Sequence, residues 1–209
     1  MRKTCRMTSI KPIIAIIIYF FITAGFVLLS NCYDVDSRQV IELLCYTSIF
    51  CAFVFLFFRE LTEDAKKIRF RQIEKLIVFF TCTIVLRLLV MAILVSNFGT
   101  STNQEHLNTL CADYPIWVYL LAYLMVPVYE ELVFRYAIMK LLDPKRALSI
   151  IVSVVIFSVL HMRPADFLDL NLIAYIIIYF GSGFCMAYIY HRTENIILPI
   201  IFHALLNIF

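Results

Sequence analysis

Residues 12–29 read "PIIAIIIYFFITAGFVLL", an apolar run that contains no charged side chain. A helix that crosses the roughly 30 Å hydrocarbon core of a bilayer needs about 20 such residues. The run follows the basic leader "MRKTCRMTSIK" and is longer than the apolar part of a secretory signal peptide, which usually has about 7–15 residues. We therefore interpret it as an uncleaved first membrane span.

The composition of the whole chain is typical of a membrane protein. Of its 209 residues, 63% are hydrophobic and 16% are charged, and the mean hydropathy is +0.90. Soluble domains carry roughly 25% charged residues, so the composition excludes that class. The net charge of +3 gives no indication of a nucleic-acid partner, and none is expected.

Seven apolar runs are candidate spans, and they lie near residues 12–30, 41–58, 76–95, 116–139, 147–162, 171–190 and 196–209. The fifth and seventh runs are short, so either could be buried among other helices without crossing the bilayer. No internal repeat or second domain is visible in the sequence. We predict an all-α, polytopic membrane helical bundle with about seven (six to eight) hydrophobic segments, forming a single domain over residues 1–209.

Lysine and arginine are distributed unevenly among the connecting segments. They concentrate in the leader, in residues 59–75 and in residues 140–146, whereas residues 31–40 hold only Arg38 and residues 96–115 hold neither type. Because positively charged loops stay in the cytoplasm, we expect a multi-pass protein of the cell membrane with a cytoplasmic N-terminus. Residues 59–75 could lie along the inner headgroups or form a solvated connector. Cys32 and Cys111 would both lie outside, and a disulfide between them is left open.

The fourth run contains "VYEELVFRY", residues 128–136, which places three charged side chains inside an apolar segment. Glu131 and Arg135 are four residues apart, so they share one face of a helix and can neutralise each other. Glu130 points about 100° away and has no such partner. Buried charges in membranes usually need a partner, so Glu130 is a candidate functional residue.

Two later runs also carry polar residues. In "FSVLH" (157–161) His161 lies four residues after Phe157, and in "FHALLN" (202–207) His203 and Asn207 are four apart, so each pair shares one helix face. Ionisable groups within membranes usually face the interior of the bundle. We therefore expect Glu130, His161, His203 and Asn207 to converge on one cavity. With a rise of about 1.5 Å per residue, Glu130 and His203 lie roughly 13 and 10 Å from a common boundary, but His161 lies roughly 21 Å from it. Its level is left open, because a tilted or re-entrant fifth segment could bring it alongside Glu130.

Other polar or small residues in the apolar runs have structural interpretations. Arg87 could pair with an acidic group elsewhere in the bundle. Gly181 and Gly183, in "GSG", would permit close packing of helices through small residues. None of these three positions is assigned a catalytic role.

The pattern Glu130-Glu131-x-x-x-Arg135, followed by Phe157-x-x-x-His161 and His203-x-x-x-Asn207, resembles the CAAX protease and bacteriocin-processing family (CPBP, also called Abi). The best-known member of that family is the type II CAAX prenyl endopeptidase. All three motifs occur in the order of the family. The resemblance covers roughly residues 115–209, which would be the catalytic core, while residues 1–114 match only as additional spans.

The resemblance implies an intramembrane endopeptidase that hydrolyses a peptide bond of a hydrophobic, lipidated or leader-type peptide or of a membrane-protein substrate. Glu130 would be the general base on water, and His161 would hold that water. His203 and Asn207 would form the oxyanion site, and Glu131 and Arg135 would support it. No cofactor and no metal are expected. Zinc held by one Glu and two His is the alternative, although the His-Glu-x-x-His motif is absent.

Two functions of other classes compete with the protease. One is a non-proteolytic membrane protein that confers bacteriocin self-immunity or regulates a sensor kinase by contact. The other is a proton-coupled transporter that uses Glu130, but the internal repeats of many transporters are not visible. The intact motifs favour the enzyme, because a binding role does not need both histidines and the asparagine.

Overall fold

The computed structural model describes residues 10–30, 32–33, 35–93, 109, 112, 115–162, 167 and 172–208. Throughout this part of the chain the regular structure is helical and no strand occurs, which confirms the predicted all-α class. Within these described residues, the uninterrupted helices are α1 (Lys11–Ser30), α2 (Val35–Ala65), α3 (Phe70–Ile93), α8 (Ala147–His161), α9 (Leu172–Thr193) and α10 (Ile197–Leu206). Between α3 and α8 lies a composite helical stretch, residues 115–141, which we call the central segment.

The central segment alternates between α-helix and the wider π-helix. It consists of α5 (Pro115–Leu120), η2 (Leu121–Met125), α6 (Val126–Glu131), η3 (Leu132–Ile138) and α7 (Met139–Leu141). Pro127 lies in the first turn of α6 and has no N–H to donate. In the turn before it, the N–H of Val126 donates to the carbonyl of Leu121, five residues back. Such π stretches are frequent at functional sites, and here they flank Glu130 and Glu131.

Each predicted apolar run falls on one helix or on the central segment. Among the residues that the structure describes, four stretches can cross a membrane by length and composition: Ser37–Ala65, Phe70–Ile93, Ile116–Leu141 and Leu172–Thr193. The shorter apolar stretches are Lys11–Phe26, Ala147–His161 and Ile197–Leu206, and the last two are the runs that the sequence already shows to be short. Together these helices indicate a multi-pass membrane protein.

Residues 59–75 do not form a separate element. Helix α2 continues through Ala65, and α3 begins at Phe70, so the basic segment is divided between two helix ends and the turn that joins them. No proline or glycine interrupts the chain between residues 41 and 65, which explains why α2 extends beyond its apolar run.

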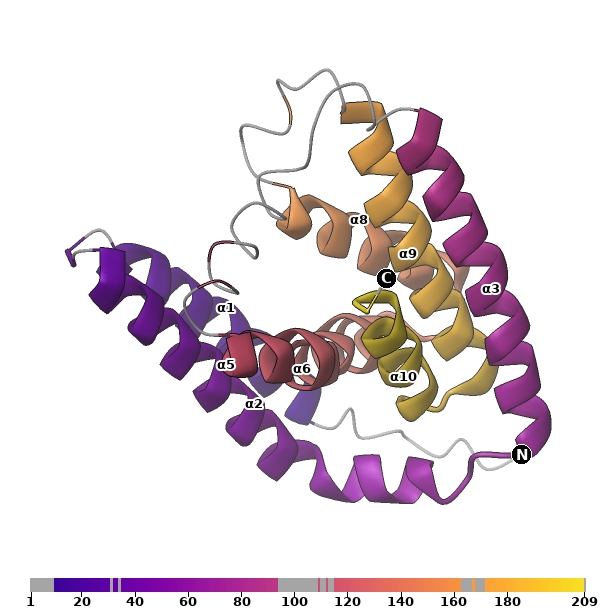
Figure 1. The fold of residues 1–209 in the computed structure, drawn as a ribbon. Coiled ribbons are helices and arrows are strands. Elements are labelled where there is room, and N and C mark those ends of the chain that lie inside the picture. Colours follow the sequence, from indigo (N-terminus) through magenta and orange to yellow (C-terminus); the bar gives the residue numbers. More distant parts are fainter. Residues whose placement is uncertain are drawn as a thin grey trace.

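The central segment lies in the middle of the bundle. Figure 1 shows it between the α1–α2 pair and the α3–α9 pair, with α10 beside α6. Helix α8 packs against α9 and η3. Every residue from 127 to 139 is buried, as expected for a helix that is surrounded on all sides. The charged residues of this stretch are therefore enclosed by protein.

Candidate active site

Glu130, near the end of α6, faces His161, the last residue of α8. Their atoms Oε2 and Nε2 are 3.4 Å apart, and both side chains are largely buried. The His161 Nδ1 lies 2.8 Å from the carbonyl oxygen of Phe157, and because a carbonyl only accepts, Nδ1 carries a proton. A neutral His161 therefore presents the lone pair of Nε2 to Glu130. The structure thus places His161 at the same level as Glu130. The position of His161 along its helix does not predict this level.

The carboxyl oxygen of Glu130 that faces His161 has unused hydrogen-bonding capacity. Oε2 is buried and makes no hydrogen bond to any other described residue. Buried polar groups are nearly always satisfied in folded proteins, so this orphaned carboxylate oxygen opposite an imidazole can accept a hydrogen bond from a water molecule or a substrate group.

Glu131 joins two other predicted residues in a second buried cluster. Its Oε2 lies 3.2 Å from Nε of Arg135, which is the predicted pair at four-residue spacing. Its Oε1 lies 2.8 Å from Nδ1 of His203 on α10, a contact that spacing alone could not reveal. Arg135 also donates from Nη2 to the carbonyl oxygen of Gly183 at 3.1 Å. An anionic Glu131 accepts a hydrogen bond from the Nδ1–H of His203. The Nε2 atom is then the ring nitrogen of His203 that remains available to a substrate.

The ring of Phe157 connects the two clusters. Its centroid is 4.1 Å from that of His161 and 5.8 Å from that of His203. The guanidinium carbon of Arg135 lies 4.3 Å from the same centroid, in a cation–π contact. Gly183 allows this arrangement, because a Cβ there would stand 3.0 Å from Cδ1 of Phe157. The predicted close packing is thus found at Gly183, whereas a Cβ at Gly181 would meet nothing within 4 Å.

Asn207 attaches the end of α10 to the central segment. Its Nδ2 donates to the carbonyl oxygen of Ala122 at 2.7 Å. That carbonyl lacks a helical donor, because the N–H of Val126 bonds to Leu121 and Pro127, the next residue, has none. The side-chain amide of Asn207 therefore satisfies an acceptor that the π stretch sets free. One of its two N–H groups remains for another acceptor.

Arg87 and Tyr179 complete the surroundings of the site. Arg87 does not contact an acidic side chain among the described residues; it donates from Nη1 to the carbonyl oxygen of Leu206 at 3.0 Å, which fixes the last turn of α10. The ring of Tyr179 on α9 lies 5.6 Å from that of His161. Neither contact has a sequence signal, since every residue offers a carbonyl and aromatic residues are abundant in this chain.

Cys111 lies outside the described residues, and so does its pairing with Cys32. Within the described residues, no three His, Cys, Asp or Glu side chains form a group that could hold a metal ion. The site instead contains two separate carboxylate–histidine pairs, Glu130 with His161 and Glu131 with His203.

Comparison with known proteins gives one match. A family model described as "Type II CAAX prenyl endopeptidase Rce1-like" matches residues 112–209, a range close to the one over which the three motifs occur. This match confirms the resemblance to the CAAX protease family. No curated protein and no solved structure matches the chain.

Proposed function

We propose that this chain cleaves peptide bonds with water activated by Glu130, because residues 112–209 match the model of the Rce1-like family of CAAX-type endopeptidases. The substrate class that we propose is a hydrophobic, lipidated or leader-type peptide, or a membrane protein. The reaction would take place at the cytoplasmic side of the bilayer, on the orientation inferred from the basic loops. Cysteine-accessibility labelling that places residues 59–75 outside the cell would overturn that orientation.

One observation carries the proposal: the orphaned Oε2 of Glu130 lies 3.4 Å from Nε2 of His161. A general base must reach its proton directly or through one water molecule. A water bound between these two atoms could donate one hydrogen bond to each of them. When the water oxygen attacks the peptide carbonyl, Glu130 takes the proton, and the pair later returns it to the leaving amine.

The second cluster supports a role in stabilising the oxyanion. Glu131 is held as an anion by Arg135 and accepts the Nδ1–H of His203. A neutral His203 would then have only a lone pair on Nε2, so donation to an oxyanion requires the imidazolium form. The carboxylate of Glu131 stabilises that charge, as the acidic member of a catalytic triad does. The remaining N–H of Asn207 is the second donor that we propose.

The decisive experiment compares the wild-type protein with Glu130→Gln. Purified chains are incubated with candidate peptides, and the products are identified by mass spectrometry. Glutamine keeps the size of the side chain but cannot accept the proton of water, so the variant should lose cleavage and still bind peptide. Its thermal stability in detergent serves as the control and should match that of the wild type.

Other outcomes would contradict the proposal. A variant that melts as early as Arg135→Ala would make Glu130 part of the scaffold. If Glu130→Gln retains the full biological function in cells, the protein acts by contact, as a non-proteolytic immunity or regulatory protein.

A further inference from the structure

A cavity lies away from the candidate active site, where the turn between α2 and α3 meets the turn between α9 and α10. It is an open cavity of about 490 Å³, and the residues that line it are Lys67, Arg69, Arg71, Gln72, Lys75, Thr193, Glu194 and Asn195. This volume lies within the range of about 300–1,000 Å³ that is common for sites of small ligands. The cavity is therefore large enough for a headgroup-sized molecule.

The charge of the lining is strongly positive. Four of its side chains are cationic and one, Glu194, is acidic. Lys67 pairs with Asp64 at 2.8 Å, and Glu194 pairs with Lys145 outside the cavity at 3.4 Å. Arg69, Arg71 and Lys75 form no ion pair with an acidic side chain in the described part of the chain. Several cations without an acidic partner favour an anionic ligand.

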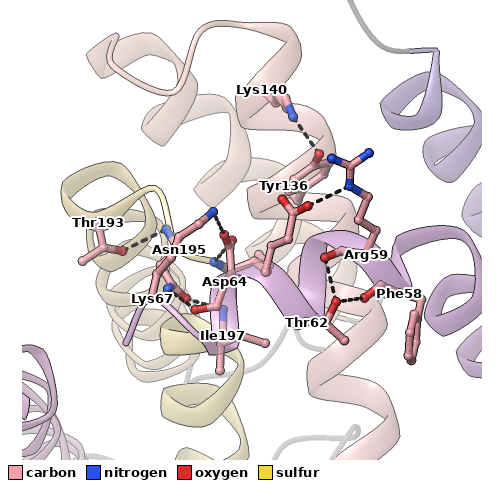
Figure 2. Close-up of polar contacts among 12 residues, drawn as sticks. Phe58, Arg59, Thr62, Asp64, Lys67, Tyr136, Lys140, Thr193, Asn195 and Ile197 are labelled. Atoms are coloured by element: carbon pink, nitrogen blue, oxygen red, sulfur yellow. Dashed lines mark hydrogen bonds and ion pairs between the residues drawn. The ribbon is translucent and has the colours of Figure 1, made fainter. Parts of the chain in front are cut away.

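One wall of the cavity is fixed by hydrogen bonds that Figure 2 shows around Asp64 and Asn195. The amide of Asn195 donates to the backbone carbonyl of Asp64 at 2.7 Å, and the N–H of Ile196 donates to the Asp64 carboxylate at 3.1 Å. The side-chain oxygen of Asn195 accepts from the N–H of Ile197 at 3.0 Å. These bonds connect the end of α2 to the beginning of α10, so the wall is already formed before any ligand binds.

The surroundings of the cavity indicate that the anion belongs to a lipid. The cavity opens where two membrane-crossing helices, α2 and α3, end and begin. Apolar side chains alternate with the cations there, since Phe70 is 76% exposed and Ile73 is 39% exposed. Basic residues at the ends of spans lie at the level of the headgroups, and basic pockets between spans bind anionic headgroups. A soluble phosphate would use the cations but not the neighbouring apolar side chains.

We propose that this cavity binds the headgroup phosphate of an anionic phospholipid, with Arg69, Arg71 and Lys75 as the main contacts. Lys67 contributes less charge, because Asp64 already neutralises it. A bound headgroup would bridge the α2–α3 turn and the α9–α10 turn. This proposal does not depend on the proposed peptidase activity.

Binding is measured with the full chain purified in detergent micelles. A fluorescent phosphatidylglycerol is titrated by anisotropy, with phosphatidylcholine carrying the same label for comparison. Each cation near a membrane surface contributes about fivefold to the affinity for anionic lipid. Arg69→Gln/Arg71→Gln should therefore raise the apparent Kd roughly 25-fold. Binding of the phosphatidylcholine should be weak and unchanged by the substitutions.

A matched variant, Lys66→Gln/Arg192→Gln, removes the same charge from two exposed residues that do not line the cavity. It should bind phosphatidylglycerol as the wild type does. Equal weakening in both double variants would overturn the proposal in favour of general surface charge. Displacement of the lipid by an equal concentration of glycerol 3-phosphate would overturn it in favour of a soluble phosphate. Lys75→Gln tests the cavity independently if the arginine variant does not fold, and unchanged binding would also refute the proposal.

Discussion

Replacing Gly183 by alanine tests whether Phe157 holds the two halves of the candidate site together. The new Cβ would lie 3.0 Å from Cδ1 of Phe157, whereas ordinary contacts begin at about 3.4 Å. The ring must therefore move by about 0.4 Å, the difference between these two distances. It contacts the ring of His161 and lies under Arg135, so both side chains would be displaced with it.

Two opposing contributions determine the stability of Gly183→Ala. Overpacking of a core typically costs about 1–3 kcal/mol, while alanine gains about 0.5–1 kcal/mol over glycine inside a helix. The net loss in the free energy of unfolding is therefore about 0–2.5 kcal/mol. A misplacement of 1 Å can cost about a hundredfold in rate, so a shift of this size should lower kcat/KM on the order of tenfold.

Gly181→Ala is the matched control, because a Cβ there would meet nothing within 4 Å. Its free energy of unfolding should rise by about 0.5–1 kcal/mol, because alanine is more favourable than glycine inside a helix. Its activity should be unchanged. The assays are thermal unfolding in detergent and peptide cleavage, run on both variants and the wild type. If Gly183→Ala matches Gly181→Ala in both assays, Phe157 does not couple Gly183 to the site, and this reasoning is wrong.

Three further results are expected. Arg135→Ala leaves the buried anion of Glu131 with His203 but without its cationic partner, and it should cost about 3–5 kcal/mol of stability. An unchanged melting temperature would contradict the ion pair. Asn207→Ala should lower the free energy of unfolding by about 1–3 kcal/mol, because the Ala122 carbonyl loses its donor. This loss should be smaller in a Pro127→Ala background, where residue 127 has an N–H to donate. Equal losses in both backgrounds would show that the proline does not cause the missing bond. A membrane-permeable chelator should leave cleavage intact, and a loss that zinc restores would indicate a metal mechanism.

The sequence predicted those features that depend on local periodicity. Among the described residues, hydropathy located the six uninterrupted helices and the central segment, because a span must remain apolar over about 20 residues. The pairing of Glu131 with Arg135 followed from their spacing, since residues four apart share a helix face. Both predictions require no knowledge of how the helices pack against one another.

Contacts between helices could not be predicted in the same way. The bond between His203 and Glu131 joins residues 72 positions apart, and the level of His161 depends on how α8 is oriented. The partners of Arg87 and Asn207 are backbone carbonyls, which every residue has. For Asn207, the one indication in the sequence is Pro127. A proline within a helix leaves a carbonyl without its backbone donor, so another donor must satisfy that carbonyl.

Helix α10 has ten residues, and helices shorter than about 12–15 residues are marginal on their own in water. Its position depends on bonds to other elements: Asp64 at its beginning, Glu131 along its length, and Ala122 and Arg87 at its end. Local opening of this one helix would remove His203 and Asn207 from the site together while the long spans stay folded. Amide hydrogen exchange should therefore reveal α10 as one cooperative unit, and mild denaturant should abolish activity before the bundle unfolds.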